Sequence, residues 1–299
     1  MGALLERLER GEVILGDGAH GTMLMARGLP PGAPPETMNL TRPEEVEAVA
    51  RAYREAGAEL LTTNTFGGSP LMLAARGLEG SFEEVNRTGV EAALRAAEGQ
   101  ALVSASVGPC GCMLQPYGDA DPGRVQESFR QQVDVLAAAG ADCICIETMT
   151  DLAEAELAVC AAREIAPDLP VLASVTFEPT PRGFFTIMGN SVEQVVAGLA
   201  PAGAHVLGSN CGNGSDVMVE LARVLRAATE LPLVIQPNAG LPVQRDGALH
   251  YPEDPAFMAV RIQTLRELGV AIVGGCCGTT PAHIRAMKRG HSSLRTTAN

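Results

Sequence analysis

The sequence predicts a single (β/α)8 barrel that occupies the whole chain of 299 residues. Short apolar runs alternate with longer amphipathic segments eight times, which is the pattern of repeated strand–helix units. The apolar runs are continuous, as is typical of parallel strands that are covered by helices. No Ser- or Pro-rich linker divides the chain, and one barrel domain commonly uses about 250 residues or more. A doubly wound open sheet is the weaker alternative, because the glycine-rich turn at 16–22 does not have the dinucleotide-binding spacing.

The first half of the chain contains four of the predicted strands. A short amphipathic helix at the N-terminus precedes a brief strand at 13–15. Thr41 to Glu44 has the pattern of a capping box and predicts a helix that ends at Glu55, and Gly57 then separates this helix from the next strand. The remaining elements of this half are predicted as strands at 58–63, 101–107 and 142–146 and as helices at 82–98 and 124–139.

The second half repeats the same alternation. Asp151 opens the helix after the fourth strand, and Ser191 to Gln194 opens a later one. The last strand begins at Val270 and stops at a glycine-rich turn, after which Thr280 and Pro281 match the N-cap and first position of a final helix. The other elements are predicted as strands at 171–177, 205–209 and 233–236 and as helices at 215–229 and 254–268, and a polar tail at 291–299 follows the barrel.

The composition excludes several classes of partner. The chain carries a formal net charge of -13 and has no run rich in Lys or Arg, which argues against binding to nucleic acid or to anionic membrane surfaces. The N-terminal segment combines acidic residues with helical spacing, unlike a signal peptide or a membrane span. We therefore expect a cytoplasmic protein, in which the eight cysteines are reduced and serve as metal ligands or core residues.

Polar residues collect where the predicted strands end. In a barrel, the C-terminal ends of the strands converge on one mouth, so residues that are far apart in the sequence become neighbours there. A structural role remains open for three of them: Asp17 can cap a turn, Glu147 can pair with an arginine of a neighbouring helix, and Asn238 can satisfy loop backbone. The complete set is Asp17, Asn64, Thr65, Ser106, Glu147, Glu178, Cys211, Asn238, Cys276 and Cys277.

Three cysteines at strand ends suggest a metal site. Cys276 and Cys277 are adjacent and flanked by glycines, and adjacent cysteines rarely bridge to each other without strain, so they either pack or share a metal. Cys211 also ends an apolar run with a glycine-rich exit, which favours the metal. Three thiolates would form a tetrahedral zinc site with one open position. Such a site can hold a substrate thiol as thiolate, so the reaction implied is alkyl transfer to sulfur.

The other cysteines are given structural roles. Cys143, Cys145 and Cys160 occur within strand or helix runs and are predicted to be small core residues. Cys110 and Cys112 lie near the mouth, but a Cys-Gly-Cys pair without partners is a weak signal, so we interpret them as bystanders.

Six motifs resemble those of the homocysteine S-methyltransferase family, over about residues 12–288. By this resemblance, the fold is a (β/α)8 barrel, zinc is bound by Cys211, Cys276 and Cys277, and the homocysteine sulfur takes the open position. Asp17 and Glu147 would hold its amino group, and backbone around Ser106 to Gly108 would receive its carboxylate. Asn64 lies in one of the motifs and is a further candidate for substrate binding, and Asn238 would occupy the fourth metal position before the substrate arrives. The motifs are Gly16–Thr22, Thr63–Gly67, Ile146–Thr148, Ser209–Gly212, Pro237–Gly240 and Gly274–Pro281.

The resemblance also bears on the methyl donor. Branches with sulfonium donors commonly have Arg after the cysteine pair and Ser after Pro-Asn, whereas this chain has Gly278 and Ala239, similar to the homocysteine domain of cobalamin-dependent methionine synthases. Because the barrel accounts for nearly all residues, no folate or cobalamin domain is expected in this chain. The favoured donor is therefore a methylated corrinoid carried by a separate protein, and the alternative is S-methylmethionine or S-adenosylmethionine. The chain departs from the family pattern at His20 and at 108–113.

Two hypotheses for a function other than methyl transfer stay open. One is a metal-assisted aldolase, although such enzymes favour His and carboxylate ligands and the five histidines do not form such a set. The other is a non-catalytic barrel that binds zinc or an amino acid. Methionine formation from homocysteine distinguishes both from a methyltransferase.

Overall fold

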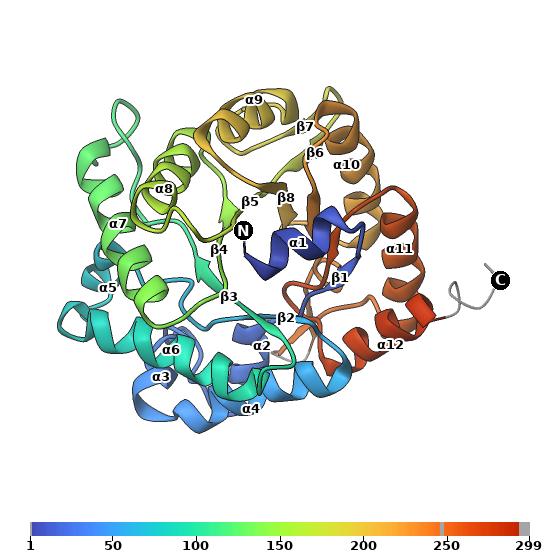
Figure 1. Ribbon diagram of the computed structural model, residues 1–299, viewed down its shortest axis with the longest axis horizontal. Coiled ribbons are helices and arrows are strands. Elements are labelled where there is room, and N and C mark those ends of the chain that lie inside the picture. Colours follow the sequence, from blue (N-terminus) through green and yellow to red (C-terminus); the bar gives the residue numbers. More distant parts are fainter. Residues whose placement is uncertain (1, 246–247, 293–299) are drawn as a thin grey trace.

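The computed structural model describes residues 2–245 and 248–292, and its central feature is a closed barrel of eight parallel strands (Figure 1). Each strand pairs in parallel with the next one along the chain, and the last pairs with the first. A parallel bridge between Gly16 and Leu60 completes the ring. The predicted fold class is confirmed. The strands are β1 (Ile14–Leu15), β2 (Leu60–Thr62), β3 (Leu102–Val107), β4 (Cys143–Met149), β5 (Val171–Val175), β8 (Val206–Asn210), β9 (Leu233–Gln236) and β12 (Ile272–Val273).

Helices surround the barrel (Figure 1). Several begin at side-chain caps, including a complete capping box between Ser191 and Gln194. The capping box predicted at Thr41 to Glu44 is wrong, because Thr41 ends a preceding short helix and Pro43 starts the next one without a side-chain cap. The surrounding helices are α4 (Pro43–Ala56), α6 (Phe82–Ala97), α7 (Pro122–Ala138), α8 (Leu152–Ile165), α9 (Val192–Ala202), α10 (Ser215–Ala228), α11 (Pro255–Glu267) and α12 (Pro281–Ser292).

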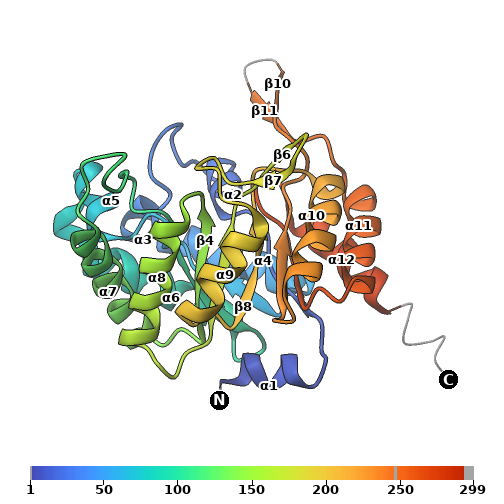
Figure 2. The same ribbon diagram turned by 90° about the horizontal axis from the view of Figure 1, so that it is seen from above.

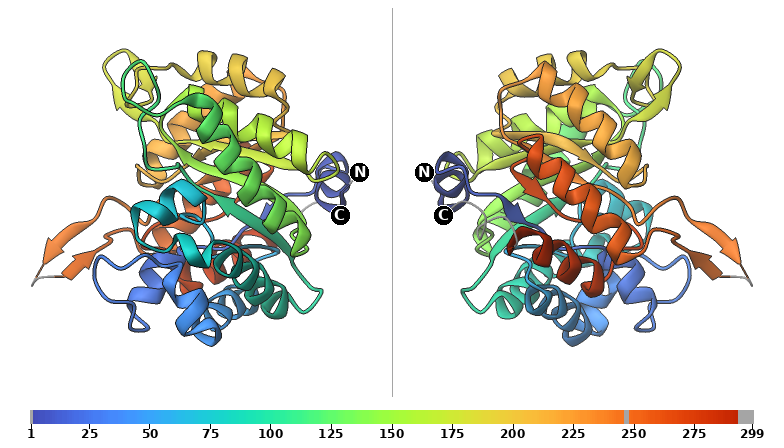
Figure 3. Two further views of the ribbon diagram at one scale, coloured as in Figure 1. Left: turned by 90° about the vertical axis from the view of Figure 1, so that its left-hand side faces the viewer. Right: turned by 90° about the vertical axis from the view of Figure 1, so that its right-hand side faces the viewer.

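Short elements occupy the connections after several strands, where the sequence analysis places only turns and loops. They include two antiparallel hairpins, one formed by β6 and β7 and the other by β10 and β11. The hairpin of β10 and β11 projects from the face opposite the N-terminal helix (Figures 2 and 3). Glu178 lies in the first hairpin and is exposed. The prediction that it belongs to the polar residues inside the mouth is therefore wrong. These elements are α2 (His20–Met25), α3 (Thr37–Thr41), α5 (Pro70–Ala75), the 3-10 helix η1 (Glu79–Ser81), β6 (Glu178–Thr180), β7 (Gly183–Phe185), β10 (Val243–Arg245) and β11 (Ala248–His250).

The apolar core has two parts. The larger lies between the strands and the outer helices, and the smaller fills the barrel interior. Helix α1 (Ala3–Glu9) lies across the end of the barrel opposite the hairpins, and its Leu4 joins the interior cluster (Figure 2). Cys143 and Cys145 are buried in this interior, as predicted. Cys160 is exposed, so its predicted core role is wrong, because α8 buries the positions on its other face.

Two further predictions concern membrane-spanning helices and the C-terminal tail. Within residues 2–245 and 248–292, no helix is long and apolar enough to cross a membrane. Of the predicted polar tail at 291–299, His291 and Ser292 continue α12, and residues 293–299 lie outside the described residues.

Candidate active site

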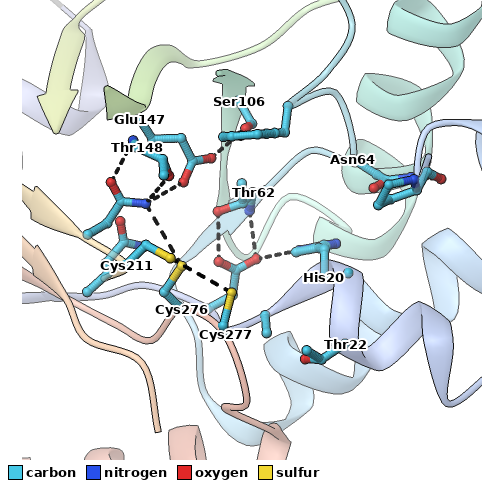
Figure 4. Close-up of a pocket in the computed structure, with 18 of the residues that line it drawn as sticks. His20, Thr22, Thr62, Asn64, Ser106, Glu147, Thr148, Cys211, Cys276 and Cys277 are labelled. Carbon is cyan, nitrogen blue, oxygen red and sulfur yellow. Dashed lines mark hydrogen bonds and ion pairs between the residues drawn. The ribbon is translucent and has the colours of Figure 1, made fainter. Parts of the chain in front are cut away.

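A cavity of about 420 Å³ opens at the C-terminal ends of the strands (Figure 4). Its size falls within the range of roughly 300 to 1,000 Å³ that is usual for small-molecule sites. Of the predicted residues at the strand ends, Thr65, Glu178 and Asn238 do not line it, and the other seven come from the ends of β3 and β4 and from the loops after β1, β2, β8 and β12. The lining members of the predicted set are Asp17, Asn64, Ser106, Glu147, Cys211, Cys276 and Cys277.

Three thiols form one wall of this cavity. The Sγ atoms of Cys211, Cys276 and Cys277 all lie within 4.8 Å of one another, and those of Cys211 and Cys277 are 3.9 Å apart. Cys211 has φ of +61°, a left-handed conformation that is uncommon for residues other than glycine and is often found at functional sites. Backbone hydrogen bonds to the segment after β9 hold the cluster, because Cys276 N donates to Pro237 O and Ala239 N donates to Cys277 O.

The charge of the cluster is concentrated on one sulfur. Hydrogen bonds from the Cys276 and Cys277 thiols lower the pKa of the Cys211 thiol to about 3. Hydrogen bonding to the Cys211 sulfur, together with burial and the negative charge on Cys211, raises the pKa of Cys277 to about 11 and that of Cys276 well above its ordinary range. Asn238 is 5% exposed, and its Oδ1 has no hydrogen-bond partner among the described residues. Three soft sulfur donors within 4.8 Å of one another suit a metal ion that accepts thiolate ligands.

Asp17 is held in the cavity by hydrogen bonds from two directions. It is 1% exposed, and it accepts from Thr62 N at 2.7 Å and from Thr62 Oγ1 at 2.8 Å. His20 Nε2 lies 3.0 Å from Asp17 Oδ2. The partners of Asp17 therefore come from β2 and α2. They fix its carboxylate inside the cavity, and the alternative that Asp17 only caps a turn does not describe these contacts.

Glu147 is the second buried carboxylate of the cavity. Burial raises its pKa to about 7, and the negative charges of Asp17 and Cys211 act in the same direction, while a hydrogen bond from Ser106 Oγ lowers it. Among the described residues it makes no ion pair with an arginine, so the structural alternative for this position is not observed. The group is therefore poised between its neutral and charged forms near neutral pH.

Asn210 connects this carboxylate to the thiols and was not among the residues predicted from the sequence. Its Nδ2 donates to Glu147 Oε2 at 3.0 Å and lies 3.9 Å from Cys276 Sγ. The same amide bonds both the backbone and the side chain of Thr148, which has φ of +59° at an irregularity in the register of β4. The available signal was the position of Asn210, directly before Cys211 at a strand end.

Two predicted substrate contacts are already engaged within the protein. Both hydrogens of the Asn64 amide are donated, to Pro35 O and to Asn39 Oδ1, each at 2.8 Å. Ser106 N donates to the Thr63 hydroxyl at 3.0 Å, and Gly108 N donates to Phe66 O, in the loop after β2, at 2.9 Å. A carboxylate can be received by these amides only if those bonds are exchanged, and the substrate roles of Asn64 and Ser106 stay predictions.

A charged pair at the cavity was also missed. Glu36 is 1% exposed, accepts from Gly67 N at 2.6 Å and pairs with Arg76 at 3.1 Å. Both side chains line the cavity. The cavity thus combines a soft metal-binding wall, two buried carboxylates that suit a cation, and a guanidinium that suits a carboxylate.

Comparisons with known proteins identify the family of this chain. A family model described as homocysteine S-methyltransferase matches residues 14–290. The chain is 33% identical over 301 residues to a methionine synthase of Mycobacterium leprae and 32% identical over 302 residues to one of Mycobacterium tuberculosis, covering 94% and 95% of this chain. It spans about a quarter of the length of these curated relatives.

Solved structures include a similar protein of nearly the same length. The metallated form of the homocysteine methyltransferase MmuM from Escherichia coli has a TM-score of 0.80 and 28% sequence identity, and the match covers 96% of this chain and 99% of that one. The oxidised form of the same protein matches with a TM-score of 0.79.

Proposed function

This chain belongs to the homocysteine S-methyltransferase family, as its motifs predicted, and from that membership we propose that it transfers a methyl group to the thiol of L-homocysteine, forming methionine. The observation that carries the proposal is the meeting of three thiols and two buried carboxylates in one cavity. Homocysteine has a thiol at one end and an ammonium at the other, so it matches both groups of side chains at once.

The metal of the proposed enzyme is zinc, held by Cys211, Cys276 and Cys277. Asn238, whose buried Oδ1 has no partner among the described residues, would complete the ligand set before the acceptor binds. When bound, zinc supplies positive charge that favours the thiolate of the acceptor, whose thiol otherwise has a pKa of about 8.5. Thiolate donors in a tetrahedral set support this choice of metal.

The protein's own side chains would bind and orient the acceptor. Asp17 and Glu147 offer buried carboxylates to its ammonium, where charge-assisted hydrogen bonds are strong. Thr62 and His20 fix Asp17, while Asn210 fixes Glu147 relative to Cys276. The two carboxylates and the three thiols are thus held in fixed positions in the cavity. The site would therefore favour an acceptor whose ammonium and thiol can reach both groups at once.

The raised pKa of Glu147 predicts that amino-acid binding strengthens with pH. Glu147 is neutral below about pH 7 and anionic above it, and an ammonium prefers the anion. Burial is the largest cause of the shift, so the shift should persist when metal is bound. The affinity of the zinc-loaded protein for methionine, which has no thiol proton to lose, should rise by about tenfold between pH 6 and pH 8.

Isothermal titration of methionine into the wild type and into Glu147→Gln, at several pH values, checks this expectation. All other titrations remain in both proteins, so the difference between their slopes reports Glu147. The same slope in both proteins would contradict the assignment.

For the donor, we propose a methylated corrinoid that is carried by a protein. Gly278 and Ala239 support this choice by resemblance, as described above. In the described part of the chain, nearly all exposed large apolar side chains lie on segments between a barrel strand and the outer helix that follows it. Because the C-terminal ends of the strands share one face of a barrel, these side chains lie on the face where the cavity opens, which a carrier protein would have to approach. These residues are Met25, Met113, Tyr117, Ile187, Leu241, Val243 and Leu249.

A small sulfonium donor is the second candidate, and Arg76 is the observation that favours it. S-methylmethionine and S-adenosylmethionine both have a carboxylate, and Arg76 lines the cavity with a guanidinium that can bind one. Its present partner Glu36 would then have to share or release it.

Methionine formation from homocysteine tests the proposed function and the donor together. Zinc-loaded protein is offered methylcobalamin, methylcobalamin on a carrier protein, S-methylmethionine and S-adenosylmethionine in separate reactions. We expect turnover with methylcobalamin in at least one of its two forms. Turnover with a sulfonium alone would reverse the choice of donor, and homocysteine binding without turnover by any donor would support a non-catalytic binding barrel.

A further inference from the structure

A second pair of thiols lies outside the cavity, in the segment that follows β3. The sulfurs of Cys110 and Cys112 are 3.1 Å apart, and neither residue lines the cavity. Gly111 between them has φ of +79°, a conformation that glycine adopts without strain, and this turn brings the two side chains together. A disulfide needs a sulfur separation of about 2.05 Å, so an approach of roughly 1 Å would join them.

The two thiols differ in how accessible they are. Cys110 is 2% exposed, whereas Cys112 is partly exposed and stands beside Met113, which is 53% exposed. A reagent in solution therefore reaches Cys112 first. Cys110 is buried, so we expect its thiol to react only after Cys112 has reacted.

A buried carboxylate completes the group. Glu154, from the first turn of α8, is 5% exposed, and its Oε1 accepts from Cys110 N at 2.7 Å. Burial raises the pKa of Glu154, and burial together with the charge of Glu154 raises the pKa of the Cys110 thiol. The Glu154 carboxyl group is also coupled by a side-chain hydrogen bond to the Cys110 thiol, so this thiol is the group with which it can exchange a proton.

We propose that Cys110 and Cys112 form a redox-active dithiol that reduces small disulfides, an activity separate from methyl transfer. The Cys112 thiolate attacks one sulfur of the disulfide, forms a mixed disulfide and releases the first thiol. Glu154 then takes the proton of Cys110, whose sulfur attacks the sulfur of Cys112 and displaces the second thiolate, which is protonated in turn. In balance, the small disulfide gains two electrons and two protons, and the dithiol loses them to become the Cys110–Cys112 disulfide.

The test uses full-length, zinc-loaded protein, so that the three-thiol cluster holds its metal. The probe is 2-hydroxyethyl disulfide, a neutral compound that the net charge of -13 does not repel. All proteins carry Cys160→Ser, which removes the exposed lone thiol of α8. Released thiol, intact mass and a peptide map without reduction are recorded.

The parent protein should release two thiols per chain, lose two hydrogens in mass and show a peptide linkage between Cys110 and Cys112. Cys110→Ser should release one thiol and keep an adduct on Cys112. Cys112→Ser should react far more slowly, because Cys110 is buried. A stable adduct on the parent protein, or a parent that does not react, would overturn the proposal.

Glu154→Gln tests the proton transfer by removing the base while keeping a side chain of similar size and shape. The glutamine oxygen can still accept from Cys110 N, but it cannot take the thiol proton. The mixed disulfide should therefore accumulate and resolve at least about tenfold more slowly than in the parent protein, since a positioned base contributes roughly 10² to 10⁴ in rate. Resolution at the parent rate would remove Glu154 from the mechanism, and metal content and methyl transfer by the same sample report whether the protein is folded.

Discussion

Replacing Cys211, Cys276 or Cys277 by serine should abolish both zinc binding and methionine formation. Each change removes one of three sulfur donors that lie within 4.8 Å of one another, and a hydroxyl is a poor substitute for a thiolate ligand. Because every role proposed for the acceptor sulfur depends on this cluster, this is the largest effect that we expect. Metal analysis of the purified variants, followed by the methionine assay, measures both losses.

The matched control is Cys160→Ser, which changes an exposed cysteine on α8, away from the cavity. It should retain zinc and activity at the level of the wild type. Full zinc occupancy in any one of the three cluster variants would exclude that cysteine from the metal site.

Asp17→Asn and Glu147→Gln should each weaken homocysteine binding by about tenfold or more while zinc stays bound. A charge-assisted hydrogen bond contributes about 1.5 to 3 kcal/mol, and about 1.4 kcal/mol corresponds to a factor of ten in affinity. Both amides retain the shape of the acid, and the oxygen of each can still accept one of the hydrogen bonds from Thr62 or Asn210. Titration calorimetry with homocysteine gives the affinity, and metal analysis of the same samples gives the zinc content.

Asp142→Asn provides a control just before the strand that contains Glu147. Asp142 precedes β4 and accepts from Val103 N at 2.7 Å, whereas Glu147 lies toward the other end of the strand in the cavity. This variant should bind homocysteine with unchanged affinity. If neither Asp17→Asn nor Glu147→Gln weakens binding, the ammonium is held elsewhere.

The barrel and its mouth could be predicted because the relevant signals are local in the sequence. Each strand is a continuous apolar run that stops at a polar or glycine-rich turn, and the topology of a parallel barrel then brings the strand ends together. Cys211 and the cysteine pair at 276–277 could be placed in one site for this reason alone. Their separation in sequence is irrelevant once the strands are assigned.

The short elements around the mouth could not be predicted, because tertiary contacts hold them. Helix α3 has five residues, too few for a hydrophobic period to be recognised. Its Asn39 donates to Asn64 O and Val85 O, which belong to the loop after β2 and to α6. Nothing near Asn39 in the sequence indicates these partners.

The positioning bonds of the site were missed for a related reason. Thr62 reaches Asp17 only because β1 and β2 pair in a register that a bridge between Gly16 and Leu60 fixes. Asn210 reaches Glu147 across β5, in a geometry that depends on the irregular end of β4. Register between strands of this kind is a property of the assembled barrel and leaves no local pattern in the sequence.

The central claim is that the three-thiol cluster binds zinc and receives the sulfur of homocysteine. X-ray absorption at the zinc edge, recorded on the same zinc-loaded sample before and after homocysteine is added, tests it most directly. We predict three sulfur ligands and one lighter ligand before addition, and four sulfur ligands afterwards. An unchanged count of three sulfurs at saturating homocysteine would contradict the account, because the acceptor thiol would then lie away from the metal.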